Sequence, residues 1–278
     1  MPLQAQRWLR RMRGGAQAHM VEAADGSCWV VKATSNPQHR RILVNEWIAG
    51  SFLRYLQIRS PEAAVIDLPA SLVEAEPRLC IELGRRQVRI PAGWHFGSRY
   101  PGDPDRTAVY DFLPDALLAN VSNLGDFAGT FVFDKWVCNS DARQCIFYRA
   151  ERREPASQES PALVRPGFVA SMIDHGFVFD GPNWRFGDAP RFGLYISPRV
   201  YSGIRGWDDL EPWLSRIEHF PEEQADLALR GIPPEWIAGD EPAIEETLSR
   251  LFDRRRRVRA IVEDAIAQLG GKWFPAWR

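Results

Sequence analysis

Four charged side chains, spread over the sequence, have the types that phosphoryl transfer requires. Lys32 ends the apolar run CWVVK, and Glu46 stands in the middle of LVNEWIAG. A strand-borne lysine can contact nucleotide phosphates, and a helix glutamate can hold its flexible ammonium in place. Asp141 follows in NSDARQ and Asp174 in ASMIDHG. One such carboxylate would orient the attacking hydroxyl, and the other would hold Mg²⁺ on the phosphates.

Each of these residues also has an ordinary structural interpretation. A lysine at a strand end usually extends its ammonium to solvent, and an aspartate at a polar junction is typical of a turn. The order in which they occur is far rarer by chance than any one of them: glycines, lysine, helix glutamate, then two loop aspartates. The combination therefore favours a kinase-like site.

A glycine segment precedes the lysine. Gly14 and Gly15 stand in RGGAQAH, directly before the first of two strand-like runs. Two glycines there allow the backbone to approach a phosphate closely, and Gln17 and His19 would add side-chain donors. Taken alone, a Gly-Gly pair is more typical of an ordinary turn.

The elements that must position these residues begin with a β-rich part containing one helix, up to about residue 110. Asp25-Gly26 between two β-rich runs predicts a hairpin that ends at Lys32. Apolar residues at helical spacing predict a helix over about 38–57, which carries Glu46. Further strands are predicted at AAVIDL, RLCIEL and RQVRI, and the Gly-, Pro- and Asp-rich stretch 91–107 is predicted to be a loop or connector.

The second part is mainly helical, with two short strands in its middle. A helix is predicted to run through SNLGDFAGTFVFDKWVCN into the Asp141 motif, with Asp134 and Lys135 as a surface pair. The strands are predicted at QCIFYR and FVASMIDHGFVF, separated by a polar loop over 150–167, and the chain is predicted to be helical from Trp207 onward. The fold class expected from this order is α+β with two lobes.

Composition limits the function classes. The chain has 278 residues, 45% of them hydrophobic, which is enough for one large domain or a small lobe fused to a larger one. A formal net charge of -1 gives no general reason to expect nucleic-acid or membrane binding. The four cysteines lack metal-ligand spacing, no apolar run is long enough to span a bilayer, and the N-terminus does not resemble a secretory signal. Free thiols and a cytoplasmic location are therefore expected.

Six motifs together resemble the HipA-like kinase family, specifically its stand-alone branch: GGAQAH, WVVK, NEW, HFGSRY, FDKWVCNSDARQ and MIDHGF. The resemblance covers roughly residues 14–210 and is fairly specific because the motifs occur in a joint order and spacing. It implies a bilobal fold distantly related to protein kinases and phosphatidylinositol kinases, with ATP and Mg²⁺ between the lobes. The β-rich N-lobe would be residues 1–110, and the mainly helical C-lobe residues 111–278.

The resemblance also implies roles for individual residues. Lys32 matches the ATP-binding lysine and Glu46 its helix partner, while Asp141 matches the catalytic aspartate. Asp174 of DHG matches the metal-binding aspartate. The phosphate-facing loop is matched by the segment 14–19, which consists of Gly14, Gly15, Ala16, Gln17, Ala18 and His19.

Two further polar groups are candidates for binding. Arg99 in HFGSRY can hold a phosphate or a substrate carboxylate through its planar fork, or can simply belong to a connector. His175, beside Asp174, is expected to orient the aspartate loop rather than to act as a general base.

One position departs from the wider superfamily, which places a metal-binding Asn five residues after the catalytic aspartate. That position is Ile146 here, so Gln144 or Asn139 is left to supply an amide oxygen to the metal. The departure keeps open a nucleotide-binding pseudokinase that acts through a partner.

The leading hypothesis is an ATP- and Mg²⁺-dependent phosphotransferase that modifies a protein Ser/Thr hydroxyl. A small-molecule kinase of the aminoglycoside or sugar type and the pseudokinase are the alternatives. The best-known members of the family are toxins, so the resemblance also implies an antitoxin-like partner. Their substrate is not carried over, because nothing in the sequence encodes its recognition surface.

Overall fold

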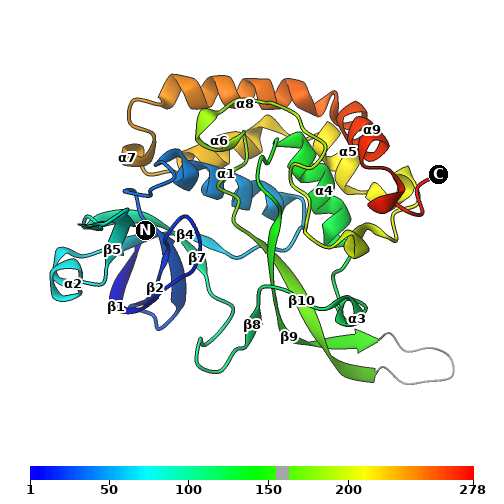
Figure 1. The fold of residues 1–278 in the computed structure, drawn as a ribbon. Coiled ribbons are helices and arrows are strands. Elements are labelled where there is room, and N and C mark those ends of the chain that lie inside the picture. The colour runs from blue at the N-terminus through cyan, green and yellow to red at the C-terminus, as the bar shows by residue number, and fades with distance from the viewer. Residues whose placement is uncertain (155–162) are drawn as a thin grey trace.

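A closed five-stranded barrel forms the first part of the structure, a computed structural model that describes residues 1–154 and 163–278. The strand order around the barrel is β1-β2-β3-β7-β4, and parallel pairing of β1 with β4 closes it (Figure 1). The other neighbouring strands are antiparallel. The barrel strands are β1 (Leu3–Arg11), β2 (His19–Ala23), β3 (Cys28–Lys32), β4 (Ala63–Leu68) and β7 (Gly93–Arg99).

The predicted hairpin and the predicted strands of this part are confirmed. β2 and β3 pair around the Asp25-Gly26 turn, and Trp29 and Val31 of β3 point into the barrel core. β5 (Cys80–Leu83) and β6 (Arg86–Arg89) form a separate two-stranded sheet. Strand β1 and the short helix α2 (Ala70–Ala75) were not predicted, since the alternation in β1 is masked by its charged residues.

The prediction of a loop over 91–107 is wrong, because Gly93–Arg99 is the barrel strand β7, between β3 and β4. Gly97 explains the error. A Cβ on this residue would lie 2.4 Å from Cγ1 of Ile66, so glycine is needed where the barrel side chains approach the backbone closely. A glycine that suggested a turn in the sequence instead marks tight packing inside a strand.

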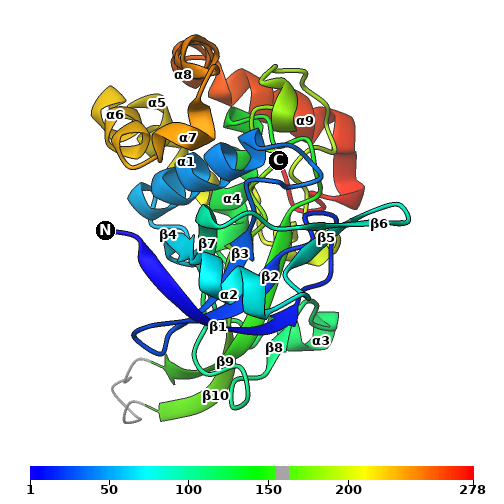
Figure 2. The ribbon, with the colours of Figure 1, turned by 90° about the vertical axis from the view of Figure 1, so that its left-hand side faces the viewer.

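Helix α1 (Arg41–Tyr55) confirms the helix predicted over 38–57. Figure 2 shows it between the barrel and the helices α6 (Glu222–Arg230) and α7 (Pro234–Ile237), and it contacts all three. Apolar residues on most of its circumference are buried, which is expected of a helix packed on both sides. Its buried polar residues, Asn45 and Glu46, therefore need partners within the protein.

The second part contains a three-stranded sheet and a group of helices. The sheet, ordered β10-β9-β8, is a long hairpin with one short added strand, and it extends away from the helices (Figure 1). Its strands are β8 (Val109–Tyr110), β9 (Gln144–Glu154) and β10 (Leu163–Ile173). The remaining helices are α3 (Asp115–Leu118), α4 (Asp126–Trp136), α5 (Trp213–Glu218), α8 (Glu241–Arg255) and α9 (Val258–Leu269). Short 3₁₀ turns occupy Gly181–Asn183, Pro198–Tyr201, Trp207–Leu210 and Gly270–Lys272.

The two predicted strands, the helix before Asp141 and the helical C-terminal part are confirmed. The polar loop predicted over 150–167 is wrong at both ends, because β9 and β10 continue into it, and its middle, 155–162, lies outside the described residues. The four cysteines, all within the described part, are free thiols, as expected. No helix among the described residues is long and apolar enough to cross a membrane.

Candidate active site

Three of the four charged residues singled out in the sequence meet at one point. The Lys32 ammonium, at the end of β3, forms ion pairs with Glu46 of α1 and with Asp174, directly after β10. Its Nζ lies 2.7 Å from Asp174 Oδ1. The side chains of Lys32 and Glu46 are only 11% and 4% exposed, whereas that of Asp174 is 29% exposed. Asp174 is therefore the member of this cluster that a ligand can reach.

The ionisation of the cluster follows from burial and from mutual attraction. Burial alone would lower the pKa of Lys32, but the carboxylates of Glu46 and Asp174 outweigh burial and raise it. Burial raises the pKa of Glu46, and the Lys32 ammonium opposes this effect. For Asp174, burial raises the pKa, but the attraction and hydrogen bond of the Lys32 ammonium, together with smaller contributions from neighbours such as Arg143, outweigh burial, so its pKa is lowered. The charged lysine between two carboxylates leaves the cluster with a negative charge, which suits a cation at Asp174.

Asn45, next to Glu46, ties α1 to the segment that follows Asp174. Its Nδ2 lies 2.7 Å from the carbonyl oxygen of Gly176 and 3.0 Å from those of Val178 and Gly181. Its Oδ1 accepts a hydrogen bond from Trp184 Nε1 at 2.8 Å. Sequence reasoning missed this residue, although it stands in the NEW motif. Asn45 and Glu46 together fix the position of α1 relative to the Asp174 loop.

Arg143, also missed in the sequence, connects the loop of Asp141 with that of Asp174. Its guanidinium forms a fully buried ion pair with Asp134, with Nε 2.8 Å from Asp134 Oδ2. Its Nη1 donates to the carbonyl oxygen of Ile173 at 3.0 Å and lies 2.8 Å from His175 Nδ1. The prediction of a surface pair at Asp134 and Lys135 is therefore wrong, because both residues are buried.

His175 is held as a neutral ring. Its pKa is lowered well below the ordinary value because the imidazole is buried and faces the cations of Arg143 and Lys32. Nδ1 can then accept from Arg143. This environment fits the expectation that His175 orients the aspartate loop.

Asp141 lies on the adjoining loop and is partly buried. Its Oδ1 accepts a hydrogen bond from the backbone N–H of Ala142 at 2.7 Å, and its carbonyl accepts from Gly193 N–H at 2.9 Å. The Lys32 cluster and Asp141 are thus separate groups, and Arg143 links the loops that carry them. The arrangement can hold a phosphate donor at one group and orient an acceptor at the other.

A model of the HipA-like kinase family matches residues 6–146 of the sequence. The chain belongs to the HipA-like kinase family. The match contains Lys32, Glu46 and Asp141 and ends before Asp174. No curated protein matches the sequence significantly.

Two similar solved structures are of the Golgi casein kinase. One is 12% identical, with a TM-score of 0.51, and covers 96% of this chain and 73% of that chain. The other, described as having Mn/ADP bound, is 12% identical with a TM-score of 0.52, covering 96% and 74%. At this identity they show the fold alone, which is a kinase-like fold of mixed α and β structure. The family membership identifies the chain as a kinase, as predicted.

Either Asn139 or Gln144 was predicted to supply the amide oxygen of the Asn that this HipA-like kinase lacks. Asn139 is buried; its Nδ2 donates to Asp134 Oδ1 at 3.0 Å, and its Oδ1 lies 3.4 Å from the Asp141 backbone nitrogen. Gln144 is exposed and is paired in register with Ile173, next to Asp174. Asn139 is thus hydrogen-bonded within its own loop, whereas Gln144 lies in the strand β9 opposite the residue that precedes Asp174. Ile146 is paired with Ser171 of β10.

The glycine segment of the kinase forms the turn between β1 and β2. Gln17 exchanges hydrogen bonds with the backbone of Glu82, at 2.8 and 2.7 Å. His19 Nδ1 accepts from Trp8 at 3.0 Å, and its Nε2 lies 3.1 Å from the carbonyl oxygen of Cys80. Both side chains therefore brace the turn on β5, and the backbone of Gly14 and Gly15 is the part that can face a phosphate.

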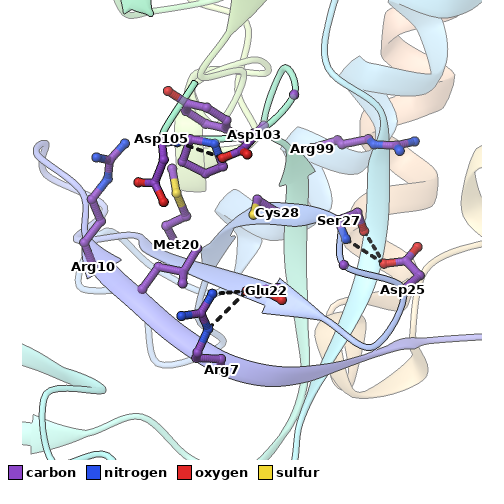
Figure 3. Close-up of a pocket in the computed structure, with 15 residues that line it drawn as sticks. Arg7, Arg10, Met20, Glu22, Asp25, Ser27, Cys28, Arg99, Asp103 and Asp105 are labelled. Atoms are coloured by element: carbon purple, nitrogen blue, oxygen red, sulfur yellow. Dashed lines mark hydrogen bonds and ion pairs between the residues drawn. The ribbon is translucent and has the colours of Figure 1, made fainter. Parts of the chain in front are cut away.

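Arg99 is not part of the Lys32 cluster. Its guanidinium forms an exposed ion pair with Glu62 at 2.9 Å, and its backbone pairs with Trp29, three residues before Lys32 on β3. It borders a cavity of about 780 Å³ whose apolar wall contains Met20, Cys28 and Tyr100 (Figure 3). Cys28 and Lys32 lie on the same face of β3, because side chains alternate along a strand. The cavity therefore lies on the same face of β3 as the Lys32 side chain.

Proposed function

We propose that this HipA-like kinase is an ATP- and Mg²⁺-dependent phosphotransferase that modifies a protein Ser/Thr hydroxyl. The observation that carries the proposal is the nearly buried Lys32 ammonium held between Glu46 and Asp174. Lys32 contacts the phosphates, Glu46 keeps Lys32 in place, and Asp141 orients the acceptor hydroxyl. Positioning and charge neutralisation account for most of catalysis in this type of reaction.

Asp174 is the residue that would hold Mg²⁺, with the Gln144 amide oxygen as a further donor. Carboxylate and amide oxygens are the ligands that Mg²⁺ prefers, and the metal would neutralise charge on the transferring phosphoryl group. The Golgi casein kinase structure with Mn/ADP bound supports a divalent metal and a nucleotide in this fold. Lys32 exchanges its contact with Asp174 for one with a phosphate, while Glu46 retains the ammonium.

The nucleotide is proposed to lie along the outer face of β3. Its phosphates face Lys32 and the backbone of Gly14 and Gly15, and its base enters the cavity beside Cys28 and Tyr100 (Figure 3). This pose divides the chain into an N-lobe of residues 1–110 and a C-lobe of residues 111–278, with ATP between them. The barrel strands, all before residue 100, and the helices α3 to α9, all after residue 114, support that division.

A protein acceptor is favoured by the resemblance to kinases of this family, and an antitoxin-like partner remains a prediction of the same resemblance. The small-molecule kinase and the pseudokinase are distinguished by where labelled phosphate goes. ATP binding and turnover with Mg²⁺ are measured for the wild type, Asp141→Asn and Asp174→Asn, with exposed Asp226→Asn of α6 as the matched control.

The expected result is ATP binding by all four proteins and turnover only by the wild type and Asp226→Asn. Transfer of ³²P from γ-labelled ATP into a protein fraction supports the protein kinase, and transfer into a small-molecule fraction supports that alternative. Nucleotide binding without transfer to either fraction points to the pseudokinase, and absence of nucleotide binding contradicts the proposal.

A further inference from the structure

Lys135 is a buried cation that the proposed reaction does not use. It lies in the last turn of α4, where only 4% of the residue is exposed. Its Nζ lies 3.3 Å from the carbonyl oxygen of Ala189, 2.8 Å from that of Pro190 and 2.6 Å from that of Phe192. An ammonium has three N–H donors, so the backbone of this one segment satisfies all of them.

The neighbouring carboxylates have other cationic partners. Asp134 is paired with Arg143, and Asp188 is paired with Arg254 at 2.6 Å. Burial accordingly lowers the pKa of Lys135 to about 8, against the attraction of Asp134 and Asp188. Burying an ammonium is costly unless its hydrogen bonds are made, so the three carbonyls are what holds this side chain in place.

The segment that Lys135 holds continues directly to the loop of Asp141. Gly193 N–H donates to the carbonyl of Asp141 at 2.9 Å, and Arg143 N–H donates to that of Leu194 at 3.0 Å. Gly193 has a φ of +68°, and a Cβ there would lie 2.2 Å from Cβ of Asp134. The segment 189–194 is therefore clamped between Lys135 and Asp134 on α4 and the Asp141 loop.

We propose that Lys135 is a positioning residue, which fixes the segment 189–194 and through it the loop that carries Asp141. The acceptor side of the site then depends on Lys135, whereas the nucleotide side, built from Lys32, Glu46 and Asp174, does not. The expected loss of turnover without Lys135 rests on the proposed kinase function. The expected loosening of the segment 189–194 does not depend on that function.

The test compares Lys135→Met with Lys272→Met, which removes an exposed lysine near the C-terminus. Trypsin cleavage after exposed Arg191 reports the mobility of the segment. Cleavage after exposed Arg85, in the β5–β6 turn, and after exposed Arg86, the first residue of β6, is the internal reference. In Lys135→Met the ratio of the two cleavage rates is expected to rise about tenfold, because local opening becomes easier. The turnover number falls about tenfold, and the ATP dissociation constant stays within about twofold. Lys272→Met matches the wild type in all three.

An unchanged cleavage ratio in folded Lys135→Met would overturn the proposal, as would a parallel loss of ATP binding. If Lys135→Met fails to fold, Gly193→Ala takes its place in the same measurements. The added Cβ would clash with Asp134 and so displace the same segment. A wild type without turnover refutes the kinase proposal alone, and the cleavage ratio still decides whether Lys135 positions the segment.

Discussion

The two ionic groups of the site, the Lys32 cluster and the Arg143–Asp134 pair, differ in their exposure to solvent. The Lys32 cluster has one partly exposed member, Asp174, and its lysine has two competing carboxylates. The ion pair of Arg143 and Asp134 has no exposed surface, and its remaining donors are used by backbone and by His175. A ligand can rearrange the first group but cannot reach the second. Ion pairs with similar chemistry thus differ in what they can do: the first is open to a ligand, and the second braces two loops.

Removing the lysine of the first group is expected to have the largest effect. Lys32→Met should lower turnover about 1,000-fold, equivalent to about 4 kcal/mol, because the phosphates lose their main cation. It should also destabilise the fold, since Glu46 becomes a buried carboxylate without its partner. Steady-state kinetics and urea unfolding measure the two effects. The double variant Lys32→Met/Glu46→Gln should regain stability without regaining turnover; recovery of both would contradict the assignment of Lys32 to binding.

Breaking the second group should mainly affect stability. Arg143→Met is expected to lower the free energy of unfolding by about 3–4 kcal/mol, because Asp134 is left charged and buried. Arg99→Met, which breaks the exposed pair with Glu62, is the control and should cost at most about 1 kcal/mol. Urea unfolding at constant pH measures both. Equal losses would show that burial does not distinguish these pairs.

A pH effect should arise from His95 in the barrel. Its Nδ1 accepts from Thr34 N–H at 3.0 Å, its Nε2 lies 2.9 Å from the carbonyl oxygen of Pro91, and burial lowers its pKa to about 4. Between pH 6.5 and 4 the unfolded chain takes up a proton that folded His95 does not, so stability falls as pH falls. The loss approaches about 3 kcal/mol near pH 4.

Urea unfolding of the wild type and His95→Gln between pH 7.5 and 4 measures this effect. The stability advantage of the wild type over His95→Gln should shrink as the solution is acidified. Exposed His219→Gln is the control, and its difference from the wild type should stay nearly constant. A difference that is independent of pH for His95→Gln would refute the prediction.

The smallest effect is expected from the contact between α1 and the Asp174 loop. Asn45→Ala should lower the free energy of unfolding by about 2 kcal/mol, because buried carbonyls lose a donor. It should also weaken ATP binding, since Glu46 and Asp174 lose their common support. Calorimetric ATP titration and urea unfolding test this, with exposed Asn183→Ala as the control. Unchanged ATP affinity would show that Glu46 is positioned independently of Asn45.

The sequence predicts elements and residues whose signals are local or ordered along the chain. The β2–β3 hairpin and α1 follow from turn chemistry and apolar spacing, and Lys32, Glu46 and Asp174 follow from their order. Contacts that close only in three dimensions could not be predicted. Arg143 appeared as one polar loop residue among several, and the adjacent charges of its buried partner Asp134 and of Lys135 suggested a surface pair. Gly97 shows the same limit, because tight packing and a turn both favour glycine.

The closure of the barrel gives the first residues of the chain a protective role. Leu3 and Gln4 pair with Ile66 and Asp67, and both precede the stretch 6–146 that the family model matches. A shortened chain that begins at residue 6 would keep every residue proposed for chemistry and would lose this pairing. β4 would then present unpaired backbone groups, which invite edge-to-edge association between molecules. Self-association of such a shortened protein would come from an opened sheet edge, with the lysine site itself intact.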